Sequence, residues 1–102
     1  MSDIRQAHEA LVERVLDGQG VASRDQRRSA FHASDLAAPL GTLVDKVAKH
    51  ASRVTDEDVA TVRAAGFNED ELFELVVCAA IGQATRQYEA AMAALVTATA
   101  KG

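Results

Sequence analysis

Apolar residues recur along most of the chain at the three- and four-residue spacing of amphipathic helices. The first such segment, residues 4–16, is apolar on one side, and Gly18 follows it as a residue suited to ending a helix. Ser23 then stands where an N-cap would begin a short polar helix that reaches Phe31. The first third of the chain therefore predicts two helices joined by a glycine-containing turn.

The middle of the chain predicts two more helices. Pro39 precedes a strongly one-sided segment, residues 40–54, whose apolar positions face away from its charged ones. Thr55 and Asp58 have the spacing of a capping box with Asp in the usual Glu place. This box predicts a short helix, which Gly66 would end in a left-handed conformation.

The last segment predicts a long helix. Asn68 and Glu71 repeat the capping spacing, and no proline interrupts the chain from there to about Thr99. Gly82 marks a bend or a close crossing with another helix. Apolar residues cover most of the circumference of the first half but form only a stripe in the second, so we expect the first half to lie at the centre.

Composition supports an all-α fold. The chain has 102 residues, of which 48% are hydrophobic, only 4% are aromatic and 21 are alanine. This length suits one domain with one core, and the alanine content favours closely packed helices over a β-sandwich. The sequence predicts a single domain, residues 1–102, of about five helices.

Net charge and cysteine content limit which binding partners and which cellular compartment are expected. The net charge of −4 argues against binding nucleic acid mainly by neutralising phosphates. A single cysteine permits no internal disulfide, the start does not read as a signal peptide, and no apolar run approaches the roughly 18 residues needed to cross a bilayer. We therefore expect a cytoplasmic protein with neither nucleic acid nor membrane as a partner.

Motifs for metals are absent from the sequence. His8 and Glu9 begin like the zinc protease motif, but Val12 stands where the second histidine is required. The histidines at positions 8, 32 and 50 lie on separate elements without cysteine or carboxylate at ligand spacing. We expect no metal and no cofactor.

A nucleic-acid interface has two weak candidates. Residues 55–77 could form a helix-turn-helix, but four polar and acidic residues, 68–71, open the second helix and would repel phosphates. The only basic cluster consists of Arg24, Arg27 and Arg28, which we interpret as a solvated or interface surface.

Glu74 and Cys78 are the most informative chemical groups. Glu74 lies on the apolar arc of the long helix, nearly in line with Cys78. Its carboxylate is either paired, with Arg86 of a neighbouring copy as one partner, or a catalytic acid or base in a desolvated pocket. Cys78 lies among small apolar residues, which predicts a buried hydrophobe and not a reactive thiolate. His50 is expected to pack at the edge of its helix.

Several stretches resemble the carboxymuconolactone decarboxylase and alkyl hydroperoxidase D-like family. Residues 54–58, 64–67 and 71–75 carry the resemblance and read Val-Thr-Asp-Glu-Asp, Ala-Ala-Gly-Phe and Glu-Leu-Phe-Glu-Leu. It is strongest from residue 43 to residue 95. The resemblance implies an all-α domain that assembles into dimers, trimers or hexamers through its helices.

The family's peroxidases use a Cys-x-x-Cys pair followed by a histidine. The resemblance places these positions at Ala51, Val54 and Asp58, so all three functional groups are missing. Without a resolving thiol the peroxidase cycle cannot close. The decarboxylase branch uses acid–base chemistry with His and Glu, and His50 is the only histidine near that region.

Three functions stay open at this stage. The first is a homo-oligomeric protein, associating through its second and fifth helices, that binds a small apolar or carboxylate ligand with Arg86 and Cys78 as contacts. The second is a cofactor-free decarboxylase or isomerase that uses Glu74, His50 or Asp58, with Arg86 holding a substrate carboxylate. The third is a DNA-binding helix-turn-helix protein.

Overall fold

The computed structural model describes residues 2–101, and within that range every regular element is a helix. The elements in chain order are α1 (Ser2–Asp17), α2 (Arg24–His32), α3 (Leu40–His50), the 3-10 turn η1 (Ala51–Arg53), α4 (Asp56–Ala64) and α5 (Glu69–Lys101). The prediction of an all-α fold with about five helices is confirmed. The third helix is shorter than predicted, because η1 replaces its last turn.

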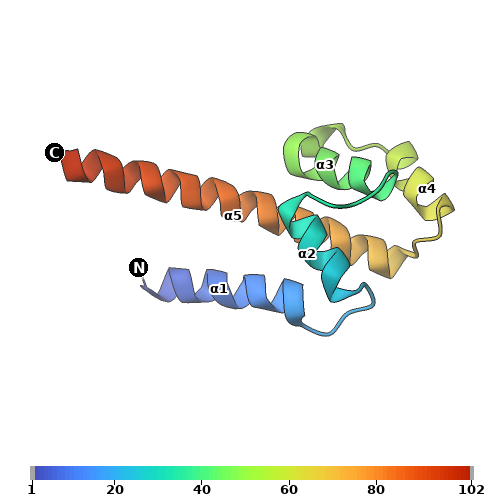
Figure 1. Ribbon diagram of the computed structural model, residues 1–102, viewed down its shortest axis with the longest axis horizontal. Helices are drawn as coiled ribbons and strands as arrows, with labels where there is room; N and C mark the ends of the chain where they lie inside the picture. The colour runs from blue at the N-terminus through green and yellow to red at the C-terminus, as the bar shows by residue number, and fades with distance from the viewer. Residues whose placement is uncertain (1, 102) are drawn as a thin grey trace.

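The 33-residue helix α5 organises the fold. Its first half is covered by α2 and α3, and α4 packs against α3 (Figure 1). Its second half runs antiparallel to α1, which lies beside it as a second long rod (Figure 1). The molecule is therefore a helical body at one end with a two-helix extension at the other.

The core lies between α2, α3, α4 and the first half of α5. Its largest fully buried side chains are Leu43, Leu75, Val44, Val62 and Cys78. The expected central position of the first half of α5 is confirmed by these residues. Phe73 is the exception, because this residue of α5 is 71% exposed.

The predicted helix caps are present. Thr55 accepts a hydrogen bond from the Asp58 backbone N–H at 3.2 Å, and the Asp58 carboxylate accepts one from the Thr55 N–H at 2.9 Å. Asn68 and Glu71 form the same reciprocal pair at 2.8 and 3.1 Å. These bonds satisfy backbone donors that the first turn of a helix leaves without partners, and so fix where α4 and α5 begin.

Two glycines act as the sequence predicted. Gly66 follows α4 with a φ of 113°, a conformation open to glycine and strained for other residues. Gly82 lies where α2 crosses α5, and a Cβ added there would collide with the backbone carbonyl of Phe31. The close crossing predicted at Gly82 is therefore confirmed.

The chain is more extended than a compact domain of its length. Its radius of gyration is 15.5 Å, against about 13 Å expected for 102 residues. Its accessible surface is 6875 Å², against about 5,500 Å² expected for its mass. Helix α1 and residues 85–101 of α5, which together we call the arm, extend away from the helical body (Figure 1).

Candidate functional site

Glu74 is anchored to the loop between α1 and α2. Its carboxylate accepts hydrogen bonds from the backbone N–H of Val21 at 2.8 Å and of Ala22 at 3.3 Å. The side chain is half-buried, so both carboxylate oxygens have partners where water is partly excluded. Within one chain, Glu74 therefore stabilises a loop and forms no ion pair with Arg86.

Arg27 is buried, which corrects the expectation of a solvated surface for the cluster that contains it. Its residue is 5% exposed, and its guanidinium donates to the carbonyl oxygens of Gly18 at 2.7 Å and Val15 at 3.5 Å. The last carbonyls of α1 point into the protein there and need donors that their own helix cannot supply. The two other arginines of the cluster are exposed, in agreement with the prediction.

Arg27 and Glu74 lie close to each other across Gly20. A Cβ added to Gly20 would collide with Glu74 Oε1 and would lie 3.5 Å from Arg27 Nη1. Their charges therefore offset each other at the end of α1. Arg27 Nε is buried and has no hydrogen-bond partner among the residues that the structure describes.

Cys78 is a buried, neutral thiol, as predicted. Its residue is 1% exposed, and its Sγ donates to the Val15 carbonyl oxygen at 3.3 Å. Burial raises the pKa of the thiol to about 11, with Arg27 lowering it and Glu74 raising it by smaller amounts. A thiol with so high a pKa has little thiolate at neutral pH and is a weak nucleophile.

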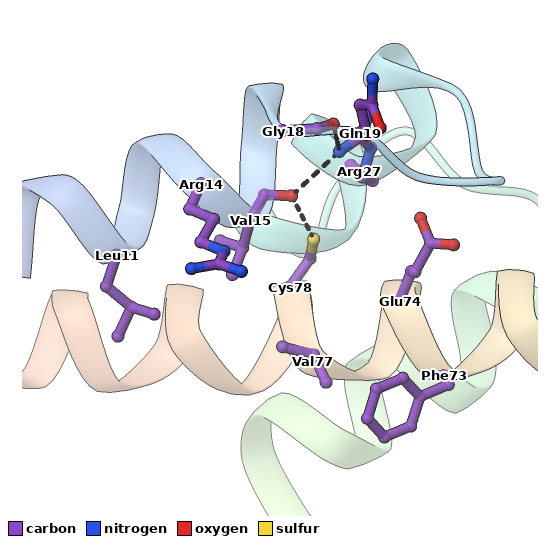
Figure 2. A pocket seen from close by; sticks show the side chains of 10 residues that line it. All are labelled: Leu11, Arg14, Val15, Gly18, Gln19, Arg27, Phe73, Glu74, Val77 and Cys78. Carbon is purple, nitrogen blue, oxygen red and sulfur yellow. Dashed lines mark hydrogen bonds between the residues drawn. The ribbon is translucent and has the colours of Figure 1, made fainter.

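These groups border one cavity of about 370 Å³ between α1, the α1–α2 loop and α5, which we call the Cys78 groove. Figure 2 shows Cys78 and Glu74 rising from α5 toward the loop, and Arg14 descending toward them from α1. The ten lining residues are Leu11, Arg14, Val15, Gly18, Gln19, Arg27, Phe73, Glu74, Val77 and Cys78. The groove thus combines apolar walls with two cations, one carboxylate and a thiol.

Asp58 and His50, predicted beside Glu74 as alternative acid–base residues, lie elsewhere. Asp58 caps α4 and receives a hydrogen bond from Lys46 Nζ at 2.8 Å. Lys46 and the Thr55 N–H lower the pKa of the Asp58 carboxyl. His50 is exposed at the end of α3. The structure does not bring the three residues into one site, because each belongs to a different helix and has its own local role.

Arg86 is also separate from the Cys78 groove. Its guanidinium donates to the Phe31 carbonyl oxygen at 2.7 Å and to Gln83 Oε1 at 3.0 Å. It therefore does for the end of α2 what Arg27 does for the end of α1. The prediction that Arg86 and Cys78 share a ligand is not supported by this arrangement.

A polar contact between α1 and α5 is not predicted by the sequence. His8 Nε2 lies 3.0 Å from Thr85 Oγ1, and the His8 ring stacks on Tyr88 with 5.4 Å between centroids. Thr85 donates its proton to the Ile81 carbonyl at 2.7 Å, so His8 must donate to Thr85 through Nε2. The sequence shows only that His8 lies on the first predicted helix and Tyr88 on the last, and it does not show that the two helices meet there.

Within residues 2–101, no three metal-ligating side chains come together, and no helix is long and apolar enough to cross a membrane. Comparison with known proteins finds no matching family model, no matching curated protein and no matching solved structure.

Proposed function

We propose that this chain is a self-assembling, carboxymuconolactone decarboxylase-like helical protein that lacks dithiol peroxidase chemistry and binds a small apolar molecule in the Cys78 groove. The proposal that the protein binds a ligand is based on the groove itself. It is a cavity of about 370 Å³, within the usual size range of small-molecule sites, with mainly apolar walls and a few polar groups.

The family assignment rests on the resemblance of residues 43–95 and agrees with an all-helical chain of about five helices. The positions of the family dithiol fall on Ala51 in η1 and on Val54, which follows it. Asp58, at the position of the family histidine, caps α4. None of these side chains is a thiol, which supports the proposal that this protein lacks peroxidase chemistry.

Self-assembly is supported by the surface of the arm. The chain exposes about 1,300 Å² more than a compact domain of its mass, while a standard interface hides about 800 Å² of each partner. Ile4, Leu95 and Val96 on the arm are each more than half exposed. A second copy packed on the arm would cover these side chains.

Acid–base catalysis is the weaker candidate. It would require a carboxylate and a histidine near one substrate, whereas Glu74, His50 and Asp58 lie apart and the Glu74 oxygens already accept two backbone hydrogen bonds. We therefore favour ligand binding over turnover.

The test is a titration with N-phenyl-1-naphthylamine, a neutral apolar fluorophore whose emission rises when it leaves water. We expect saturable binding to the wild-type protein. Leu11→Gln places an amide in the wall of the Cys78 groove and should weaken binding at least about fivefold, because an unpaired polar group in a hydrophobic contact is unfavourable.

Leu95→Gln is the matched control, because it makes the same change at an exposed leucine of α5 that does not line the groove. It should leave the dye affinity within twofold of the wild type. Absence of saturable binding, or equal affinity of the Leu11→Gln variant and the wild type, would refute the proposed ligand site.

A further inference from the structure

The walls of the Cys78 groove carry one more positive than negative charge. Arg14 and Arg27 line it together with a single carboxylate, that of Glu74. Arg27 and Glu74 lie close together, and Glu74 is held by two backbone N–H groups. The unbalanced charge therefore belongs to Arg14.

Arg14 is free to contact a ligand. Among the residues that the structure describes, its guanidinium forms neither a hydrogen bond nor an ion pair, although arginine offers five donors. Figure 2 shows its side chain reaching from α1 into the space above α5, near Cys78 and Val77. A ligand in the groove would meet this guanidinium at the open side.

The buried cation at the other end of the groove points the same way. Arg27 is 5% exposed and lines the groove, yet its Nε has no hydrogen-bond partner in the described part of the chain. An unsatisfied donor on a buried cation is unfavourable. An acceptor oxygen of a ligand within reach would satisfy this donor.

We propose that the groove selects an amphiphilic monoanion, a small carboxylic acid with a hydrocarbon body. Its carboxylate pairs with Arg14, and its hydrocarbon body packs on Leu11, Val15 and Val77. Arginine suits this role because its planar guanidinium matches a carboxylate in two parallel hydrogen bonds. This inference rests on the proposed ligand-binding function and adds the charge of the ligand.

The experiment compares three eight-carbon probes with different head groups. At neutral pH, octanoate, 1-octanol and octylammonium are anionic, neutral and cationic, and each competes with N-phenyl-1-naphthylamine for the wild-type protein. We expect octanoate to displace the dye at a concentration about tenfold below that of 1-octanol, and octylammonium to be the weakest. Added salt should weaken octanoate and leave 1-octanol unchanged.

Arg14→Gln tests the residue and Arg5→Gln is its control. Both change an exposed arginine of α1, but only Arg14 lines the Cys78 groove. Circular dichroism should show the same helix content in both variants. The preference for octanoate over 1-octanol should disappear in Arg14→Gln and persist in Arg5→Gln.

The outcomes separate this inference from the function on which it rests. If neither the dye nor any probe binds, the proposed function fails. If the dye binds but octanoate and 1-octanol compete equally, or octylammonium is preferred, only the inference is overturned. An octanoate preference that survives in Arg14→Gln also overturns it.

Discussion

The chemistry of Cys78 follows from what surrounds a single sulfur atom. The residue is 1% exposed, and its only hydrogen-bond partner within residues 2–101 is a neutral carbonyl. The nearby Arg27 lowers the thiol pKa, but desolvation outweighs this effect and the pKa rises to about 11. A cation close to a thiol therefore does not by itself produce a reactive thiolate.

We predict that Cys78 of the folded protein reacts with Ellman's reagent at pH 7.5 at least about 100-fold more slowly than in the urea-unfolded chain. A pKa about two units higher lowers the thiolate fraction by about that factor, and burial slows the reaction further. The folded protein should also show no turnover of a hydroperoxide with a thiol reductant. Peroxide turnover that disappears in Cys78→Ser would contradict this prediction.

In the sequence, Glu74 could be either a catalytic or a structural carboxylate, and in the structure it accepts two backbone hydrogen bonds. We predict that Glu74→Gln lowers the free energy of unfolding by about 1–3 kcal/mol, because an amide has one acceptor oxygen for the two N–H groups of Val21 and Ala22. Thermal and urea melts measure the change. Glu89→Gln, exposed on the same helix, is the control and should stay within about 0.5 kcal/mol of wild type. An unchanged melting temperature with lost ligand binding would favour a functional carboxylate instead.

Asp58 should determine part of the acid sensitivity of the protein. Lys46 and the Thr55 N–H lower its pKa in the folded state, so its contribution to stability is present above the unfolded pKa near 3.8. That contribution is lost as the pH falls through the lower folded pKa. We predict that Asp58→Asn reduces stability at pH 6 but changes it little at the acid end, measured as urea midpoints between pH 2 and pH 6. A constant difference across this range would show that the charge of Asp58 does not matter.

At the scale of helices, the local signals in the sequence were sufficient. The capping pairs of α4 and α5, the glycine after α4 and the N-cap Ser23 of α2 each act within a few residues, so a single sequence reveals them. The roles of Arg27 and Arg86 could not be predicted in this way. Arg27 donates to the carbonyl end of the preceding helix and Arg86 to that of a helix 55 residues away, and only the packing of α1 and α2 on α5 shows where those carbonyls lie.

The crossing of α2 and α5 gives a prediction whose sign opposes helix propensity. Replacing glycine by alanine inside a helix usually stabilises it by about 1 kcal/mol. We predict that Gly82→Ala instead destabilises the protein by about 1–3 kcal/mol, because the new Cβ meets the Phe31 carbonyl. Urea unfolding measures this change. Ala84→Gly, at an exposed position of α5, should show the ordinary loss of about 1 kcal/mol. A more stable Gly82→Ala variant would mean that the two helices separate easily.

At the scale of the whole molecule, the exposed apolar residues lie partly outside the two helices that the sequence predicts to associate. The sequence predicts association through α2 and α5, but Ala30 and Phe31 of α2 are buried within the chain. The exposed large apolar residues of the helices are Ile4 and Leu11 on α1 and Phe73, Leu95 and Val96 on α5. Sequence periodicity could identify these apolar stripes but could not assign each one to the core or to a partner. Since Leu11 and Phe73 line the Cys78 groove, we infer that a second copy would cover Ile4 of α1 and Leu95 and Val96 of α5.

We predict that the protein sediments as a multiple of 10.8 kDa at micromolar concentration. The end of α5 has few contacts within its own chain, and a lone helical end of this kind is only marginally stable in water, so burial against another copy would favour both assembly and helix formation. Leu95→Asp with Val96→Asp should shift the equilibrium toward monomer by at least about tenfold and lower the helix content. Thr97→Asp with Thr99→Asp adds the same charge to the same end of α5 without removing apolar surface, so it separates charge repulsion from lost burial.

Since the Cys78 groove lies outside residues 85–101, the leucine–valine variant should still bind N-phenyl-1-naphthylamine. A monomeric wild-type protein at micromolar concentration would contradict the proposed assembly. The dye titration would still test the proposed ligand site independently.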